Sequence, residues 1–185
     1  LPICPGLGTA EATKEVIRDI LQGCGKPVVI DADALTALVG HTEILSKMKC
    51  PRIITPHPAE MARLIDAAAA DVDARRLAVA SRYAVEWQTV VVLKGAPTVV
   101  ATPDGVAYLN TTGNEGMATG GSGDVLTGII AALLGQGLSA AEAAVLGVYL
   151  HGLAGDLAAE NGKIGLAAGQ ISENLPRARQ KVEEE

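Results

Sequence analysis

Aromatic side chains are scarce in this sequence of 185 residues, which contains no Phe, one Trp and three Tyr. Few aromatic rings leave little surface for stacking against nucleic-acid bases. The formal net charge of −6 at pH 7 also argues against a nucleic-acid partner, because binding to a phosphate backbone usually needs a basic face. An acidic protein can still bind a small anion through a few local amides and one Lys.

Cysteine is also rare. Cys4, Cys24 and Cys50 lack the spacing of a metal site and leave an odd thiol, which is typical of reduced packing residues. The longest apolar stretches, such as residues 143–154, are too short to cross a bilayer, and the first residues lack the pattern of a secretory signal. We therefore expect a cytoplasmic protein without a membrane partner.

An initiator Met is absent from the start of the chain. The sequence opens on Leu1-Pro2-Ile3-Cys4, which has the character of a strand already in progress. We therefore expect a fragment of a longer protein, although 185 residues are enough for one domain with a core of its own.

Ala, Val, Leu and Ile supply the apolar content, and β-branched runs alternate with helical patterns along the chain. This alternation is typical of a parallel sheet with crossover helices. Strands are expected at residues 1–4, 28–30, 53–55 and 90–93, followed by a hairpin that pairs 98–101 with 106–109. Helices are expected after Thr9, at 34–39, 59–65 and 72–87, from Asp124 onward, and from a capping box at Ser139.

Two of these helices carry more detailed expectations. The buried face of the helix after Thr9 is expected to consist of its large aliphatic side chains, Val16, Ile17, Ile20 and Leu21. The helix that Ser139 opens is expected to be interrupted at Gly147, Gly152 and Gly155, where another backbone lies close.

Four polar side chains follow directly after predicted parallel strands: Asp31, Asp33, His57 and Lys94. In open α/β sheets, ligands bind at this carboxyl edge, so the four residues form one candidate site. Asp31 and Asp33 could bind a metal through water or cap the next helix, and both interpretations stay open. His57 lies between two prolines, and by itself it would be interpreted as a structural residue.

Three glycines crowd around one serine in Gly120-Gly121-Ser122-Gly123, directly before the helix expected from Asp124. The amides of Gly121, Ser122 and Gly123 would be free to bind an anion, and a helix N-terminus adds roughly half a positive charge. Such an anion hole suits charge that develops on a phosphoryl group, and Asp124 could accept a proton from a substrate hydroxyl. A flexible loop with Asp124 as a helix cap explains the same composition equally well.

This loop is neither a Walker phosphate-binding loop nor a dinucleotide fingerprint, because the glycine spacing of both is absent. The segment 110–128 resembles instead the anion-hole signature of the ADP-dependent NAD(P)H-hydrate dehydratases, which belong to the ribokinase-like superfamily. Other motifs of this family occur in the same order: Pro5-Gly6-Leu7-Gly8, Asp31-Ala32-Asp33-Ala34-Leu35, Thr55-Pro56-His57-Pro58-Ala59-Glu60 and Lys94-Gly95-Ala96-Pro97-Thr98.

The resemblance implies a ribokinase-like three-layer α/β/α fold with a mostly parallel central sheet. Residues 1–185 would be the C-terminal portion of a single domain, without the family's N-terminal strands. The family uses ADP, or ATP in some eukaryotic members, to dehydrate the S form of the hydrated nicotinamide cofactor, and Mg²⁺ normally accompanies the nucleotide. The expected partners are therefore NAD(P)H hydrate and an adenine nucleotide, in a homo-oligomer.

The same resemblance implies roles for individual residues. The nucleotide would be held by Lys94, Gly95, Ala96, Pro97, Thr98, Asn110 and Gly123. The hydrate would contact Gly8, His57 and Asp124. Asp124 would be the base that frees the C6 hydroxyl for phosphorylation, after which phosphate departs and the ring double bond returns.

Some residues depart from the family pattern or stay outside it. Cys4 and Ala59 replace usual glycines near the hydrate site, where they add side chains, and Thr36 replaces a usual Asn. His151, inside a helix with several glycines, is expected in the core, and His41 in a loop.

Two rival functions stay open on the sequence. A ribokinase-like kinase that acts on a small hydroxylated vitamin precursor would use the same anion hole and Asp124. A truncated paralogue that binds nucleotide without turnover would account for the N-terminal start and for Cys4 and Ala59, although the intact Gly-Ser-Gly-Asp motif weighs against it.

Overall fold

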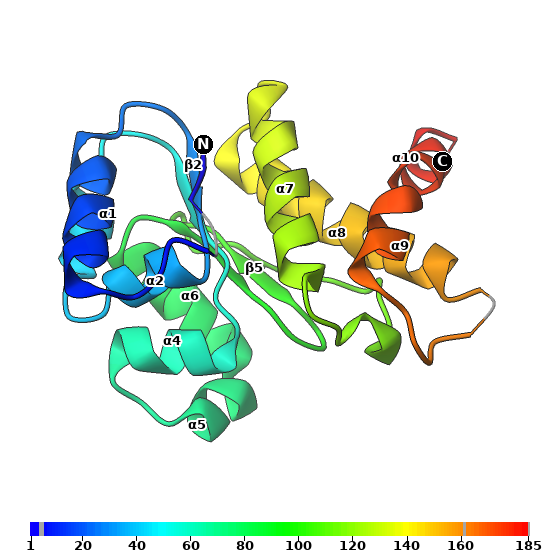
Figure 1. The fold of residues 1–185 in the computed structure, drawn as a ribbon, viewed down its shortest axis with the longest axis horizontal. Helices are drawn as coiled ribbons and strands as arrows, with labels where there is room; N and C mark the ends of the chain where they lie inside the picture. Colours follow the sequence, from blue (N-terminus) through cyan, green and yellow to red (C-terminus); the bar gives the residue numbers. More distant parts are fainter. Residues whose placement is uncertain (4–5, 161, 185) are drawn as a thin grey trace.

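A six-stranded sheet forms the centre of the computed structural model, which describes residues 1–3, 6–160 and 162–184 (Figure 1). In sheet order the strands are β1 Pro2–Ile3, β2 Val28–Ile30, β3 Arg52–Ile54, β4 Val90–Leu93, β5 Val99–Ala101 and β6 Ala107–Leu109. The first four strands pair in parallel, and β5 and β6 are antiparallel to their neighbours. The predictions of a mostly parallel sheet and a terminal hairpin are confirmed, whereas Cys4 and Pro5 lie outside the described residues.

Helices cover both faces of this sheet, because the parallel strands are apolar on both sides. In β2, Val28 and Ile30 face one hydrophobic cluster, whereas Val29 faces the other. The first face is covered by α1 Glu11–Gly23, α2 Asp33–Ala37, α3 Glu43–Lys47, α4 Pro58–Ile65, α5 Ala69–Ala74 and α6 Arg76–Glu86. The second face is covered by α7 Ser122–Gly135 and α8 Ala140–Ala158. The fold is therefore a three-layer α/β/α arrangement with an open sheet (Figure 1).

The buried face of α1 is narrower than expected. Ile17 and Leu21, one turn apart, are 2% and 0% exposed, but Val16 and Ile20 are 57% and 50% exposed. The prediction that all four side chains are buried was therefore wrong for two of them. The helix makes its main contacts with α2 and α3, so a single stripe of side chains is enough to seat it.

Other element boundaries also differ from the expectations. Residues 72–87 do not form one helix, because the chain turns at Arg75 (φ −127°) between α5 and α6. The N-cap of α1 is Ala10, next to Thr9 as expected, and α3 was not predicted. The capping box of Ser139 with Glu142 is confirmed, with a side-chain hydrogen bond in each direction.

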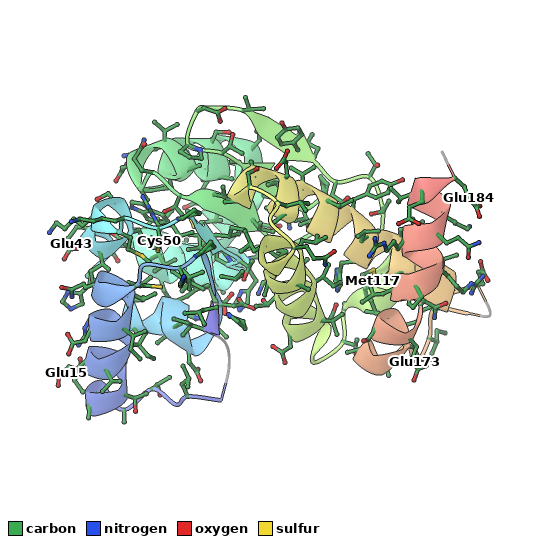
Figure 2. The ribbon with its side chains drawn as sticks, turned by 90° about the horizontal axis from the view of Figure 1, so that it is seen from above. Glu15, Glu43, Cys50, Met117, Glu173 and Glu184 are labelled. Atoms are coloured by element: carbon green, nitrogen blue, oxygen red, sulfur yellow. The ribbon has the colours of Figure 1, made fainter. Side chains whose placement is uncertain are left out.

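Helix α8 extends from the sheet into a separate C-terminal cluster. Its last half packs with α9 Ala168–Glu173 and α10 Leu175–Glu183 around Leu150, Leu157 and Ile171. Figure 2 shows Glu173 and Glu184 of this cluster at the opposite end of the molecule from Glu15 and Glu43. Among the described residues, no helix has both the length and the apolar character needed to cross a membrane.

The glycines of α8 mark close contacts, as expected, but they do not interrupt the helix, which is continuous over 19 residues. A Cβ on Gly152 would lie 2.7 Å from the carbonyl carbon of Thr112, and one on Gly155 would lie 2.2 Å from the sulfur of Met117. Met117 ends the short 3₁₀ helix Glu115–Met117 that precedes α7 and lies near α8 in Figure 2. Hydrogen bonds along the helix are kept because glycine retains its backbone amide.

Candidate active site

Asp31 and Lys94, which follow β2 and β4, meet in an ion pair at the carboxyl edge of the parallel strands. The Lys94 Nζ lies 2.9 Å from Asp31 Oδ1, and Thr127 of α7 donates to Asp31 Oδ2 at 3.0 Å. Asp31 is only 2% exposed, whereas the Lys94 side chain is 20% exposed. The ammonium group is thus held by a buried carboxylate while one side of it remains accessible.

A second carboxylate, from Glu60 in the first turn of α4, lies on the other side of Lys94. Its Oε2 is 3.6 Å from Lys94 Nζ and accepts a 2.7 Å hydrogen bond from the amide of His57. The ring Nδ1 of His57 accepts from the amides of Ala59 and Glu60, so it caps α4. Because Nδ1 is an acceptor, the neutral ring carries its proton on Nε2, and the half-exposed side chain presents a donor.

Asp33 has a different role from Asp31, although only Ala32 separates them. Its Oδ2 accepts from the amides of Gly6 and Gly8 at 3.1 and 3.0 Å, so it ties the loop after β1 to the start of α2. Ala32 has a φ of 50°, which is uncommon for a residue with a side chain and allows the two carboxylates to serve different partners.

The first turn of α7 lies directly above the Asp31–Lys94 pair. A Cβ on Gly123 would be 3.4 Å from Lys94 Nζ and 3.9 Å from Asp31 Oδ2. The amides of Gly123 and Asp124 belong to the first helical turn and have no partner within the helix. The side chain of Asp124 is exposed. Lys94, these amides and the positive end of the helix therefore form one anion-attracting position.

The start of α7 differs from the expectation, since the helix begins at Ser122 rather than at Asp124. The chain makes a tight turn before it, in which Gly121 has a φ of 87° and the amide of Ser122 donates to the carbonyl of Thr119 at 3.3 Å. The prediction of a free Ser122 amide was therefore wrong, because that hydrogen bond closes the turn.

The loop that follows Lys94 turns back on itself. The hydroxyl of Thr98 donates to the carbonyl of Gly95 and accepts from its amide. Arg76 of α6 donates to the carbonyl of Pro97 at 2.9 Å, and its guanidinium leaves no room for a side chain at Gly95. A cavity of about 610 Å³ opens between this loop and α6, with Ala96, Pro97, Val99 and Leu109 in its wall.

Asn110 joins this loop to the segment 110–114. Its amide donates to the carbonyl of Thr98, and its side chain bonds both the carbonyl and the hydroxyl of Thr112. Farther along, Asp156 of α8 accepts from the amide of Gly113 at 2.8 Å and from the side chain of Asn114 at 2.9 Å. Helix α8 therefore fixes the segment that leads to the glycine loop.

His151 of α8 is partly buried and contacts the glycine loop. Its Nε2 lies 3.3 Å from Ser122 Oγ. Burial lowers its pKa from 6.5 to about 4, the backbone of Ser122 opposes this shift, and the positive charge of Lys94 adds to it. The ring is therefore neutral near pH 7. The expectation of a core residue holds only in part, and the contact with Ser122 was not foreseen.

The structure thus gathers Asp31 and Lys94 at one sheet edge, as their positions after the strands predict, and adds Glu60 of α4 and Gly123 of α7 to them. Gly8 donates to Asp33, which is separated from Asp31 by Ala32. His41 lies in the loop before α3, beside another cavity of about 400 Å³ between α1 and α3. The roles of Thr127, Arg76 and Asp156 were not predicted, because none of them lies after a strand or within the glycine loop.

A family model described as NAD(P)H-hydrate dehydratase matches residues 2–177. This chain belongs to the NAD(P)H-hydrate dehydratase family. The match confirms the family resemblance drawn from the five motifs. The described residues of these motifs lie around the Asp31–Lys94 ion pair or hold the neighbouring loops in place.

Relatives in this family differ in length from the chain. The bifunctional NAD(P)H-hydrate repair enzyme Nnr of Moorella thermoacetica is 52% identical over an alignment of 186 positions that covers 100% of this chain and 35% of that protein. The ADP-dependent (S)-NAD(P)H-hydrate dehydratase of Neisseria meningitidis is 46% identical over 94% of the chain and 60% of that protein. The chain thus spans between about one third and three fifths of these two relatives.

Solved structures support the same fold. The ADP/ATP-dependent NAD(P)H-hydrate dehydratase of Bacillus subtilis, co-crystallised with ATP/Mg²⁺, has a TM-score of 0.87 and 37% identity, over 97% of this chain and 63% of that one. A hydroxyethylthiazole kinase from Pyrococcus horikoshii has a TM-score of 0.56 and 18% identity over 92% of this chain and 77% of that one, which indicates a shared fold only.

Proposed function

We propose that this chain carries out the ADP-dependent dehydration of the S form of NAD(P)H hydrate to NAD(P)H, with release of AMP and phosphate. The observation that carries the proposal is the position of Lys94 beside Gly123, at the positive end of α7, with Asp124 exposed in the same helical turn. Relatives named for this reaction in Neisseria meningitidis and Bacillus subtilis support it.

The nucleotide would occupy the edge formed by Lys94–Thr98 and the start of α7. The Lys94 ammonium and the amide of Gly123 lie close enough to bind the same phosphate group. Gly95, Ala96 and Pro97 form an exposed loop that Thr98 and Arg76 brace, and Asn110 is hydrogen-bonded to Thr98. We place the adenine nucleotide along these residues.

The hydrate would lie on the other side of Asp124, against His57 and Gly8. Asp124 would accept the proton of the C6 hydroxyl as its oxygen attacks the β-phosphorus of ADP, and AMP would leave with the electrons of the broken P–O bond. Departure of phosphate from C6, with loss of a proton from C5, restores the ring double bond. The amides of Gly121, Gly123 and Asp124 would stabilise the charge on the transferred phosphoryl group, and Ser122 would hold this loop in place.

Mg²⁺ is the cation that the family implies, and the site has suitable oxygen donors. Asp31 and Glu60 are buried carboxylates that both point at the Lys94 ammonium, and Thr55 at the end of β3 has a buried hydroxyl with no partner among the described residues. Carboxylates together with waters and phosphate oxygens are the usual ligands of Mg²⁺. When bound, the ion would neutralise charge on the nucleotide phosphates.

Recovery of reduced-nicotinamide absorbance from purified NADH hydrate, with Mg²⁺ and either ADP or ATP, tests the proposal directly. We expect recovery with ADP. Absence of recovery with either nucleotide, from a folded protein that binds ADP, would refute it. Phosphorylation of a small vitamin-precursor alcohol in its place would establish a kinase instead.

The proposal treats residues 1–185 as one ribokinase-like domain, supported by the continuous packing of helices on both faces of the sheet. The cytoplasmic location and the homo-oligomeric assembly stay predictions from the sequence and the family.

A further inference from the structure

The glycine-rich segment 120–123, which forms the turn before α7 and the first two residues of that helix, has a single side chain with which it can be anchored. Gly120, Gly121 and Gly123 carry none, so the Ser122 hydroxyl is the only side-chain polar atom between Thr119 and Asp124. A run of glycines has more conformational freedom than any other sequence, and ordering it costs more entropy. Besides the backbone hydrogen bonds from Ser122 to Thr119 and from Val125 to Gly121, the orientation of the Gly121 and Gly123 amides therefore depends on how the Ser122 side chain is held.

His151 provides the hydrogen-bonding partner of that hydroxyl. Ser122 is 9% exposed, and its Oγ lies 3.3 Å from Nε2 of the His151 ring. His151 is in the middle of α8, which packs against α7 and is anchored in two hydrophobic clusters. The imidazole is thus a fixed point on a long helix, whereas the loop it contacts has no other side-chain anchor among the described residues.

We propose that His151 is a positioning residue that fixes the anion hole through Ser122, so that the amides of Gly121 and Gly123 keep the orientation needed for phosphoryl transfer. The role in phosphoryl transfer rests on the proposed function. The contact between His151 and Ser122 does not depend on that proposal. His151 touches neither substrate nor nucleotide in this proposal, and it transfers no proton.

A neutral imidazole suits this role better than a charged residue. The ammonium of Lys94 and the positive end of α7 already lie on this side of the molecule, and a further cation would repel both. The burial that lowers the pKa of His151 to about 4 keeps the ring uncharged over the physiological range. The anchor therefore stays the same while the pH of the surroundings varies.

A double-mutant cycle between the two residues tests the proposal. His151→Leu and Ser122→Ala should each lower kcat by roughly tenfold or more, while KM for ADP and for the hydrate changes by less than about threefold, because an anion hole stabilises the transition state more than the ground state. The double variant should be no slower than the slower single variant, since both remove one contact. His151→Gln, whose amide can occupy the place of Nε2, should restore most of the rate.

Multiplicative losses in the double variant, or a Gln variant as slow as the Leu variant, would overturn the proposal. Amide resonances of Gly121 and Gly123 in ¹H–¹⁵N spectra give a readout that needs no turnover. They should shift alike in His151→Leu and Ser122→Ala, and unchanged positions in both would also overturn it. If the unaltered protein fails to dehydrate NADH hydrate, the proposed function is refuted but the role of His151 is not. The spectra of Gly121 and Gly123 still test whether His151 positions the loop.

Discussion

Asp124 lies in the first turn of α7, exposed at the mouth of the position that Lys94 and Gly123 define. Replacing it by Asn keeps the size of the side chain and removes the base. We expect turnover to fall by roughly a hundredfold or more, because a positioned general base contributes at least that much. The affinity for ADP should change little, and steady-state kinetics together with calorimetric binding measure both.

A matched control for this variant is Asp19→Asn on the exposed surface of α1, which should leave turnover unchanged. Comparable rates for Asp124→Asn and the unaltered protein would remove Asp124 from the role of base. A loss of ADP binding equal to the loss of rate would place the residue at the nucleotide instead.

The buried ring of His151 makes stability depend on pH. Its pKa is about 4 in the folded protein, against 6.5 for an unperturbed ring, so between these values the unfolded chain binds more protons. The free energy of unfolding therefore decreases as the pH falls from 6.5 toward 4, by about 3 kcal/mol in total from this residue. Urea unfolding curves at pH 7, 5.5 and 4 measure the slope.

Replacement of His151 by Gln should flatten this part of the pH profile. His41→Gln is the control, because that side chain is half exposed and lies in the loop before α3. An equal pH dependence in the His151 variant and the unaltered protein would contradict the prediction.

At the residue scale, the sequence predicts the residues at the candidate site better than the residues that support them. Asp31, His57 and Lys94 could be placed together because the carboxyl ends of parallel strands share one edge. The partner of Ser122 could not, since His151 lies 29 residues farther along in an apolar helix. Arg76 was missed for a similar reason: its contact with Pro97 depends on where α6 ends up in the fold.

Helix α8 and the segment 110–114 approach so closely that the contact tolerates no side chain at Gly152. A Cβ there would be 2.7 and 2.8 Å from backbone atoms of Thr112, which cannot rotate away. Gly152→Ala should therefore destabilise the protein by about 1–3 kcal/mol, despite the better helix propensity of Ala. Chemical denaturation measures the difference.

Gly128 of α7 supplies the comparison, since nothing lies within 4 Å of a Cβ at that position. Gly128→Ala should stabilise the protein by roughly 0.5–1 kcal/mol, because Ala loses less entropy in a helix. Equal changes in the free energy of unfolding for the two substitutions would mean that the segment 110–114 moves away from the added Cβ at little cost.

Elements with a strong local signal were predictable. β2 and β4 are continuous apolar runs, and the capping box at Ser139 marks the start of α8. The break at Arg75 was not, because neither Gly nor Pro marks it and the turn is imposed by packing. Packing also explains why Val16 and Ile20 are exposed. An aliphatic pattern predicts which face of a helix is apolar, but not how much of that face the neighbouring elements cover.

At the scale of the whole molecule, the described residues form three hydrophobic clusters, one on each face of the sheet and one at the C-terminal end. Ile171 of α9 is fully buried in the third. Ile171→Ala should cost about 2–5 kcal/mol locally and raise amide hydrogen exchange in α9 and α10. Exchange in α1–α4, at the other end, should stay slow.

Ile54→Ala in the first sheet-facing cluster is the matched control, because this residue is equally buried. It should raise exchange across β2, β3 and α4 instead. Uniform acceleration throughout the chain in both variants would show that the C-terminal cluster has no independent stability.

The contacts of α8 also let this helix fix the spacing of the segments that form the site. Ser122 is attached at His151, Thr112 at Tyr149 and Gly152, and Asn114 at Asp156. An α-helix advances about 1.5 Å per residue and resists stretching, so the spacing of these attachment points is fixed by counting residues. While these contacts hold, α8 therefore sets the separation between the glycine loop and the segment 110–114. A substrate of slightly different size would have to be accommodated at the sheet edge, and not by a gradual shift of these two segments.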